Sequence, residues 1–454
     1  NVFKHEAVGF FDIKYFFPQV KDGFDVVIGN PPYVLVQSLD ISTTLKSNYN
    51  SFSVAQYKTD LYHLFIEQSI IFSNKSTGVV SLITPNTFIK NKHDNKLREF
   101  VFKNTNVDFI VIFYKQVFES ASVDNAIFQM SRLKKCEKIR ISEIKNDFIL
   151  DVHYNNKYLS CENIAPPSYT ISIDMTSNTH KLIEKINKDS VRIKEIGRSY
   201  FGIQTFDRDK FVSKEKLSGS YFPVIDGANI KKYYISEHSE FIDFRKENIK
   251  SGGNPDVYKK ERIVLRQIGS YPSGAIIQPE IYTLNTIYNV FFNDDKFSLR
   301  YILSIINSNL IKFYWGILFY DNKATFPKIK KDGIESIPIK IITLAQQKPF
   351  IILVDIIIQL KQQNQDALSN HFERLINGLV YELYFPEELH QAQIYLFDEV
   401  AKLNLEKITS LTCDALTMAI EQLAKTIFKN DHPIYTMLFN LSAIDVVRTI
   451  ESKD

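Results

Sequence analysis

Four consecutive residues near the start of the chain, Asn30-Pro31-Pro32-Tyr33, combine groups that could hold a planar amine. The side-chain oxygen of Asn30 and the backbone carbonyl of Pro31 can each accept one N–H hydrogen bond. Pro31 and Pro32 stiffen the loop because proline fixes φ, and Tyr33 offers a flat ring for stacking. These groups would act by orientation and preorganised dipoles, so the neutral amide of Asn30 suffices. The alternative is a rigid turn without a chemical role.

The residues before this tetrapeptide predict where it lies. Residues 24–29 (Phe-Asp-Val-Val-Ile-Gly) are typical of a buried β-strand, which would end where Asn30 begins. In open α/β sheets, ligands bind at the carboxyl ends of the strands. In this context the tetrapeptide resembles the catalytic motif of amino-methyltransferases, which transfer a methyl group from S-adenosylmethionine to an exocyclic amine. The agreement of motif and context favours this interpretation over a simple turn.

The elements that follow alternate between helices and strands. We expect a helix from residue 60, a strand over 78–85, a helix from 96 and a strand over 107–113, with a terminal hairpin over 117–130. This order is typical of the second half of a Rossmann-like methyltransferase sheet.

Four blocks resemble the Eco57I-type adenine-specific DNA methyltransferases, which form the modification part of bifunctional type IIG restriction enzymes. The blocks are residues 23–34, 60–65, 78–86 and 117–123. The resemblance implies N6-methylation of an adenine that is flipped between Tyr33 and Phe118. A core phenylalanine is the alternative for Phe118.

The same resemblance implies S-adenosylmethionine as cofactor, but the family's Gly-rich loop and acidic ribose ligand are not found within residues 1–29. Asp60 lies in a block that borders the cofactor in relatives, although it could instead cap a helix. The chain starts at Asn1, so we interpret it as a fragment of a longer polypeptide. Its expected partner is the N-terminal nuclease and methyltransferase half, and Mg²⁺ would serve only that absent nuclease.

The composition sets further bounds. The hydrophobic content of 44% and the charged content of 24% are ordinary for a globular protein, and no apolar stretch is long enough to span a bilayer. Three scattered cysteines and nine histidines show no metal-ligand spacing, so we expect no metal site and a reducing, cytoplasmic location. The sequence says nothing about oligomeric state.

The net charge of +3 is unevenly distributed. Residues 191–340 hold 24 basic against 17 acidic residues, whereas residues 341–454 hold 9 against 15. The middle segment is therefore the candidate surface for a polyanion, and the expected partner is double-stranded DNA. A solvated basic face is the alternative.

Five blocks of this basic segment resemble the TaqI-like C-terminal specificity domain, which reads the DNA target in relatives. They are residues 202–205, 226–233, 262–267, 282–288 and 326–330. Lys and Arg can clamp phosphates, and Arg and Gln can read base edges bidentately. The candidate DNA-binding residues are Arg198, Gln204, Arg208, Lys210, Lys231, Lys232, Tyr233, Arg266, Gln267, Lys328 and Lys330; for any one of them, a plain surface role is the alternative.

The expected fold class is α/β: the C-terminal half of a Rossmann-like methyltransferase sheet, followed by a mixed α+β target-recognition domain and a helical tail. The expected boundaries are 1–150 for the methyltransferase segment, 151–190 for a connector, 191–345 for target recognition and 346–454 for the tail. The tail should hold helices over 349–362, 370–383, 388–403, 415–428 and 434–450.

These observations favour site-specific, S-adenosylmethionine-dependent adenine N6-methylation within a restriction–modification enzyme, with the fragment inactive by itself. Three alternatives stay open: a DNA-binding specificity module that is catalytically inert, a nuclease-free phage-defence methyltransferase, and a protein-glutamine methyltransferase. The last would not need the basic segment. The recognition sequence is not encoded in the composition.

Overall fold

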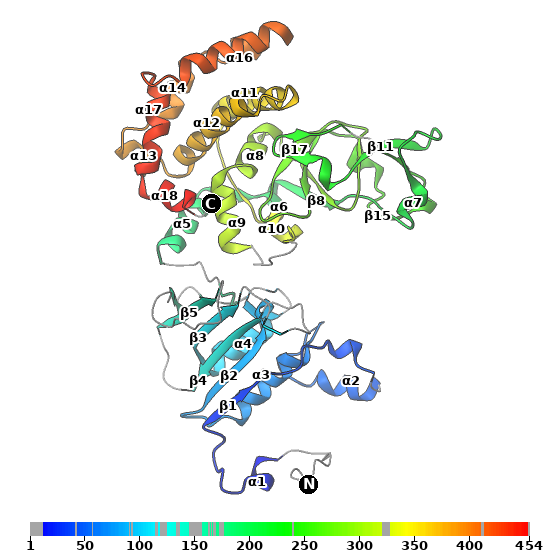
Figure 1. The fold of residues 1–454 in the computed structure, drawn as a ribbon, viewed down its shortest axis with the longest axis vertical. Helices are drawn as coiled ribbons and strands as arrows, with labels where there is room; N and C mark the ends of the chain where they lie inside the picture. Colours follow the sequence, from blue (N-terminus) through cyan, green and yellow to red (C-terminus); the bar gives the residue numbers. More distant parts are fainter. Residues whose placement is uncertain are drawn as a thin grey trace. The chain divides into compact units, whose positions relative to one another are not determined.

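The computed structural model divides into two compact units, Asn1–His180 and Lys181–Asp454 (Figure 1). The structure describes residues 12–40, 43–56, 58–89, 91, 94–113, 117–118, 125–132, 137–144, 157–161, 164, 166, 169–171, 177–237, 240–319, 327–409 and 413–452.

A six-stranded sheet forms the core of the first unit, with the strand order β1-β2-β4-β3-β5-β6. β1 runs parallel to β2 and β3 runs parallel to β5, whereas β4 is antiparallel to both β2 and β3. The strands are β1 (Val26–Gly29), β2 (Val79–Pro85), β3 (Asn106–Phe113), β4 (Asn125–Ser131), β5 (Lys138–Ile144) and β6 (Lys157–Ser160).

Two helices connect the central strands. α3 (Leu61–Phe72) packs against β2, α4 (Asn95–Asn104) packs against β3, and the two helices contact each other. Leu97 and Val101 of α4 are fully buried, as their spacing of four residues predicts. The remaining helical turns are α1 (Ile13–Phe16), η2 (Val36–Ser38), α2 (Thr43–Tyr49) and η3 (Asn86–Ile89).

The α/β fold is confirmed, and its helices and strands alternate in the expected order as far as β3. Of the hairpin expected over 117–130, only the second arm is seen, as β4, because residues 119–124 lie outside the described part of the chain. The antiparallel pair is β3 with β4, and residues 117 and 118 lie outside both strands. The sheet also continues through β5 into β6, which comes from the segment expected to be a connector.

β1 forms an open edge of this sheet. Among the described strands it pairs only with β2, and its side chains Val26 and Ile28 are 63% and 79% exposed. Phe65 and Ile71 of α3 are about half exposed as well. Large apolar side chains in parallel sheets are normally covered on both faces, and the described residues provide no such covering layer here.

Two four-stranded sheets form the β part of the second unit (Figure 1). The first has the order β17-β16-β19-β8 and consists of β8 (Gly197–Phe201), β16 (Arg262–Arg266), β17 (Gly274–Ile277) and β19 (Ile287–Phe292). The second has the order β10-β14-β11-β18 and consists of β10 (Val212–Ser213), β11 (Tyr221–Ile225), β14 (Glu240–Asp243) and β18 (Tyr282–Thr283).

Three short pairs complete these strands: β7 (Ser190–Arg192) with β20 (Pro338–Lys340), β9 (Gln204–Thr205) with β15 (Ile249–Ser251), and β12 (Ile230–Lys231) with β13 (Tyr234–Ile235). The accompanying helical segments are α5 (Ser177–Asn187), α6 (Ile193–Ile196), α7 (Arg208–Phe211), η6 (Gly227–Asn229), η7 (Lys246–Asn248), η8 (Pro255–Tyr258), α8 (Leu299–Ile306), α9 (Asn309–Leu318) and α10 (Lys331–Glu335).

The expected helical tail is confirmed and packs on this β part. α11 (Leu344–Gln362) contacts α8 and α12 (Asp366–Tyr384), and α8 in turn contacts β16 and β17. The other helices are α13 (Pro386–Gln391), α14 (Leu396–Ala401), α15 (Glu406–Thr409), α16 (Cys413–Ile427), α17 (Pro433–Asn440), η9 (Leu441–Ala443) and α18 (Asp445–Glu451). None of the helices that the structure describes is long and apolar enough to cross a membrane.

The helix boundaries differ from expectation at three places. α11 begins five residues before Pro349, because Thr343 and Gln346 form a capping box ahead of it. The helix expected over 388–403 breaks into α13 and α14, with Gln393 at a φ of 59° between them. The helix expected over 434–450 is interrupted by η9.

Candidate functional site

Asn30–Tyr33 follows β1 directly, at the carboxyl end of the parallel pair β1–β2. Asn30 and Pro32 are exposed, Pro31 is buried and Tyr33 is half-buried. The loop thus offers the Asn30 amide to solvent, while Pro31 anchors it in the fold. The position that the sequence predicts for a ligand-binding loop is the one observed.

The Tyr33 hydroxyl is the centre of the polar contacts in this loop. It lies 2.9 Å from Asn30 Oδ1 and 3.0 Å from the Ile83 carbonyl oxygen, and it accepts a hydrogen bond from Asn125 Nδ2 at 3.2 Å. A hydroxyl has one proton, so it donates to Asn30 or to Ile83 at any one time. Burial raises the pKa of Tyr33, so the phenol keeps its proton at neutral pH.

The rings around this hydroxyl come from different elements. Tyr62 in the first turn of α3 meets Tyr33 edge to face, with ring centroids 6.3 Å apart. Phe118 is half-buried, and residues 119–123 of its sequence block lie outside the described part of the chain. The stacking role of Phe118 stays a prediction.

Asp60 lies beside the loop of Asn30–Tyr33, called the motif loop below. It forms a β-bridge with Leu35, and the Leu61 N–H donates to the Val34 carbonyl at 2.9 Å. Asp60 occupies the N-cap position of α3, but its side chain makes no capping hydrogen bond. Burial raises the pKa of its carboxyl. The alternative of a simple capping role is therefore not what the structure shows. The cofactor role of Asp60 stays a prediction.

A buried polar group near this helix was missed by sequence reasoning. His63 Nε2 lies 3.4 Å from Asp94 Oδ1, and both side chains are almost completely buried. Arg98 donates to the Phe88 and Asn91 carbonyls at 2.9 and 2.8 Å. Burial lowers the pKa of His63 to about 4 and raises the pKa of Asp94 to about 7, so His63 is neutral at pH 7.

The raised pKa of Asp94 predicts how stability changes with pH. Because the folded-state pKa lies above the ordinary value of 3.8, this carboxyl stabilises the fold at low pH, and the contribution is lost as pH rises through about 7. Asp94→Asn should remove a decline of about 2–4 kcal/mol between pH 4 and 8. Urea unfolding of the first unit at several pH values measures it. An unchanged pH profile in the variant would assign the decline to another group.

In the second unit, several candidate residues are brought together at the end of β16. Gln267 accepts from the Ile329 N–H at 2.8 Å through its backbone carbonyl, and Ile268 forms a β-bridge with Lys328. Arg266 and Gln267 therefore lie beside the segment that contains Lys328 and Lys330. Both lysines are exposed.

Arg266 has an unusual environment in this cluster. Its Nε is buried without a hydrogen-bond partner, and no ion pair to its guanidinium is found among the described residues. The nearby Tyr288 hydroxyl, by contrast, donates to the Ile329 carbonyl at 3.0 Å. Among the described residues, Arg266 thus holds one unused donor, Nε, at the end of β16, and an unpaired donor of this kind calls for an explanation such as contact with a ligand.

Of the other candidate residues, Arg208 and Lys210 have partners inside the fold. Arg208 pairs with Glu240 at 2.9 Å and with Asp226 at 3.6 Å. Lys210 lies over the Phe211 ring at 5.4 Å. Arg198 and Lys231 are exposed and Gln204 is half-buried. Their predicted contact with DNA stays a prediction.

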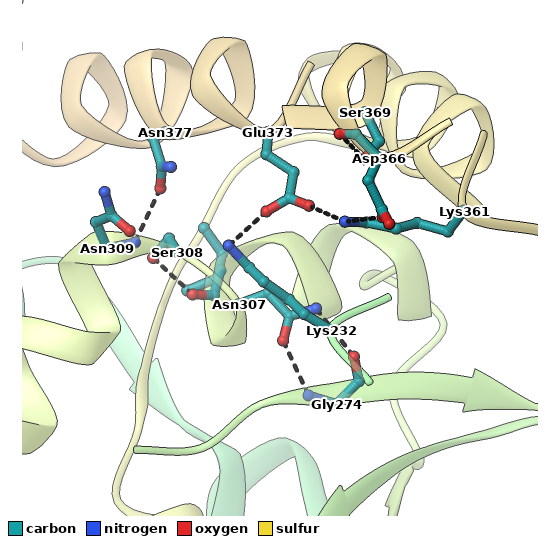
Figure 2. A network of polar contacts seen from close by, with 11 residues as sticks. Lys232, Gly274, Asn307, Ser308, Asn309, Lys361, Asp366, Ser369, Glu373 and Asn377 are labelled. Carbon is teal, nitrogen blue, oxygen red and sulfur yellow. Dashed lines mark hydrogen bonds and ion pairs between the residues drawn. The ribbon is translucent and has the colours of Figure 1, made fainter. Parts of the chain in front are cut away.

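Lys232 and Tyr233 have structural partners, which sequence reasoning did not foresee. Figure 2 shows Lys232 pointing toward Glu373 of α12, with Nζ 2.7 Å from Oε2, while Lys361 reaches the other oxygen at 3.1 Å. The Tyr233 ring is only 2% exposed and its φ is 66°. The Lys232 charge is thus neutralised by the tail, and Tyr233 packs in the core, where it cannot stack on a base in this conformation.

Comparison with known proteins gives one family match in each of the two units. Residues 2–118 match the model of the Eco57I restriction-modification methylase, and residues 222–339 match the TaqI-like C-terminal specificity domain. The first unit thus contains a methylase segment of the Eco57I type, and the second contains a specificity domain of the TaqI type.

The relatives are type II restriction–modification proteins. A putative type II restriction enzyme and methyltransferase of Methanocaldococcus jannaschii is 25% identical over 82% of this chain and 32% of its own length. The type II restriction enzyme and methyltransferase RM.Eco57I of Escherichia coli is 26% identical over 61% of this chain and 29% of its own length. This chain therefore spans about a third of these curated relatives.

Among solved structures, the DNA complex of the type IIL restriction–modification enzyme MmeI covers 94% of this chain and 57% of its own chain. Its TM-score is 0.49 at 11% sequence identity.

Proposed function

We propose that the chain contains part of the catalytic site and the target-recognition domain of a site-specific DNA adenine N6-methyltransferase, within a bifunctional type IIG-like restriction–modification polypeptide. One observation carries this proposal. The Asn30–Tyr33 loop stands at the carboxyl end of a parallel strand pair, with the Asn30 amide exposed and its oxygen 2.9 Å from the Tyr33 hydroxyl. That arrangement suits an amine-holding site.

The residues of this chain would act on a flipped adenine. The base would stack between Tyr33 and Phe118, and its N6 amine would donate one hydrogen bond to Asn30 Oδ1 and one to the Pro31 carbonyl. Held in this way, the nitrogen lone pair points out of the base plane toward the reacting carbon. S-adenosylmethionine supplies the electrophilic methyl group when bound.

Asp60 fits a role beside this cofactor. Its carboxylate has no capping hydrogen bond and stands next to the motif loop through the Leu35–Asp60 bridge. A carboxylate at this position can accept hydrogen bonds from hydroxyl or ammonium donors. We propose that Asp60 holds one side of the cofactor, and that the Gly-rich loop belongs to another half of the same polypeptide.

The open edge of β1 supports the existence of such a half. Val26 and Ile28 are exposed on a parallel strand, and Phe65 and Ile71 of α3 are about half exposed. An additional parallel strand with its helix would cover these side chains. We propose that the N-terminal half of the intact protein pairs with β1 and thereby completes the methyltransferase sheet.

Ile28→Asp tests this completion. Because Ile28 is 79% exposed, the stability of this chain should stay within about 0.5 kcal/mol of its unsubstituted value. In the intact protein, a carboxylate in the completed sheet should lower methylation at least tenfold, since it would be buried without a partner. Urea unfolding and a methylation assay measure the two effects. Full methylation by the intact Ile28→Asp protein would contradict the pairing.

The second unit would read the target. Arg266, whose Nε has no partner among the described residues, lies beside Gln267, Lys328 and Lys330, which combines base-reading and phosphate-binding side chains in one place. We propose this cluster as the core of the DNA interface, with Arg198, Gln204, Arg208, Lys210 and Lys231 as further contacts.

Selection from a pool of random duplexes at two salt concentrations tests this role with the 454-residue chain itself. We expect enrichment of one short motif that contains an adenine. Arg266→Ala should weaken binding to that motif about 10–100-fold, because one bidentate base contact discriminates by about 1–3 kcal/mol. Lys425→Ala, which removes an exposed cation from the acidic tail, is the control and should bind normally. Weak, salt-labile binding without enrichment would contradict target recognition.

A catalytically inert specificity module is the second candidate for this chain by itself. The exposed apolar edge of β1 favours it, because among the described residues nothing covers this side of the site that would hold the cofactor. A nuclease-free phage-defence methyltransferase remains a variant of the main proposal. Mg²⁺ would be needed only where a nuclease is present.

A further inference from the structure

Asn125 connects the motif loop to the interior of the sheet. It is the first residue of β4 and pairs with Pro85 at the carboxyl end of β2, so it lies at the same edge of the sheet as Asn30 and Tyr33. Its side chain is completely buried. The contact with Tyr33 joins residues 92 positions apart in the sequence.

The hydrogen bond from Asn125 restricts where Tyr33 can direct its proton. Asn125 Nδ2 donates to the Tyr33 hydroxyl oxygen at 3.2 Å. An amide NH₂ can only donate, so this side of the hydroxyl oxygen acts as an acceptor. The phenolic proton must then point elsewhere, and the acceptors within reach are Asn30 Oδ1 at 2.9 Å and the Ile83 carbonyl at 3.0 Å.

The other end of the Asn125 amide argues against a purely structural role. Its Oδ1 is buried and has no hydrogen-bond partner among the residues that the structure describes. A buried amide with an unused acceptor costs free energy that an apolar side chain of similar size would avoid. The hydrogen bond to Tyr33 offsets this free-energy cost. We therefore infer that Asn125 acts through Tyr33.

We propose that Asn125 is a positioning residue of the methylation site, which directs the Tyr33 hydroxyl proton toward Asn30 and so fixes the Asn30 carboxamide with its oxygen available to the adenine amine. This inference rests on the proposed function. Asn125 would not touch the substrate.

The direction of the Tyr33 proton matters because the exposed Asn30 amide has two ends, an oxygen and an NH₂ group, which differ in chemistry but little in shape. A hydroxyl that donates to Asn30 selects the oxygen end, and the second lone pair of that oxygen stays free for the amine. Without Asn125 the hydroxyl can rotate and accept from the Asn30 NH₂ group. The amide would then present a donor to an amine that also donates, and the base would be poorly held.

The first test reads Tyr33 directly in this chain. Tyrosine labelled with ¹³C at the ζ position gives a signal for Tyr33, which is assigned by its absence in Tyr33→Phe. Asn125→Leu should move this signal and raise the pKa of Tyr33, because the donor that stabilises the phenolate is lost. Thr84→Val is the matched control, since Thr84 is also fully buried and its hydroxyl has no hydrogen-bond partner among the described residues. An unmoved Tyr33 signal in Asn125→Leu would overturn the proposal.

The second test measures methylation by the intact protein. Asn125→Leu should lower kcat about tenfold, the effect of one lost hydrogen bond, and leave KM for DNA within about twofold. In the Tyr33→Phe background the same substitution should change kcat less than about twofold, because the two residues act through one contact. Equal losses in both backgrounds would overturn the proposal.

Asn125→Asp provides a variant that keeps the size of the side chain. Its carboxylate accepts from the Tyr33 hydroxyl and reverses the hydrogen bond, so kcat should fall at least as far as in Asn125→Leu. Normal kcat in Asn125→Asp would overturn the proposal. Absence of methylation in the unsubstituted protein would count against the proposed function, while the Tyr33 signal would still decide the role of Asn125.

Discussion

Asn30→Ala should reduce methylation by the intact protein by more than about a hundredfold, since removal of one preorganised transition-state hydrogen bond costs about that much. The substitution removes the exposed side-chain oxygen that the proposal assigns to the adenine amine. It leaves the Tyr33 hydroxyl with a second acceptor, the Ile83 carbonyl at 3.0 Å, so the loop should keep its shape. Incorporation of labelled methyl groups into DNA measures the loss.

The division of roles between the two units predicts that this variant still binds DNA. Selective binding of the 454-residue Asn30→Ala chain should match that of the unsubstituted chain, because target recognition is assigned to the second unit. Asn50→Ala, at an exposed asparagine of the first unit, is the control for an unspecific effect of the change. Loss of methylation and of selective binding together would contradict separate sites for catalysis and recognition.

Arg262→Ala should destabilise the second unit by about 3–5 kcal/mol, the cost of breaking a buried polar network. Arg262 is fully buried in β16. It donates through Nε to Asn289 Oδ1 at 2.8 Å and through a terminal nitrogen to the Ile281 carbonyl at 2.6 Å, and Asn289 donates to Thr283 Oγ1 at 2.8 Å. This chain of bonds links the sheet of β16 and β19 to β18 of the other sheet.

Equilibrium unfolding in urea measures this effect, with Arg198→Ala as control. Arg198 lies in β8 of the same sheet but is exposed, so its truncation should cost no more than about 0.5 kcal/mol. Arg262→Met separates charge from bulk, because it fills part of the space yet leaves the acceptors Asn289 and Ile281 unsatisfied. It should recover less than half of the loss. Full stability in Arg262→Met would show that packing alone explains the role of Arg262.

Local sequence was sufficient to predict the candidate catalytic loop. The apolar residues 24–29 predict a strand that ends where Asn30 begins, and the two prolines define a stiff loop. The structure has β1 over Val26–Gly29 with the loop directly after it. Strand β2 and helix α4 were equally predictable, because their apolar periodicity lies within a few consecutive residues.

Contacts between distant residues could not be predicted in this way. Asn125 meets Tyr33 across 92 positions, and its own neighbours give no sign that the amide points inward. Lys232 was expected to bind DNA because a lysine in a basic segment favours solvent, but its partner Glu373 comes from the acidic tail. Composition sets a segment's net charge, whereas pairing depends on the tertiary fold.

Burial of charged groups was the other feature that sequence did not indicate. The sequence around Arg262 predicts an ordinary strand with basic residues. The two acceptors of its side chain, a backbone carbonyl and a side-chain amide oxygen, come from other parts of the fold. The His63–Asp94 contact likewise joins α3 to the start of α4. Strand β6 was not predicted, because Lys157–Ser160 is short and partly polar. It forms a strand only by pairing with β5.

The most direct test of the central claim is to map N6-methyladenine in the DNA of a methylation-free host that expresses the intact protein. The account predicts methylation of one adenine within one short motif, the same motif that the 454-residue chain selects from random duplexes, and none with Asn30→Ala. Absence of N6-methyladenine with the unsubstituted protein, or methylation at a motif that this chain does not select, would contradict it.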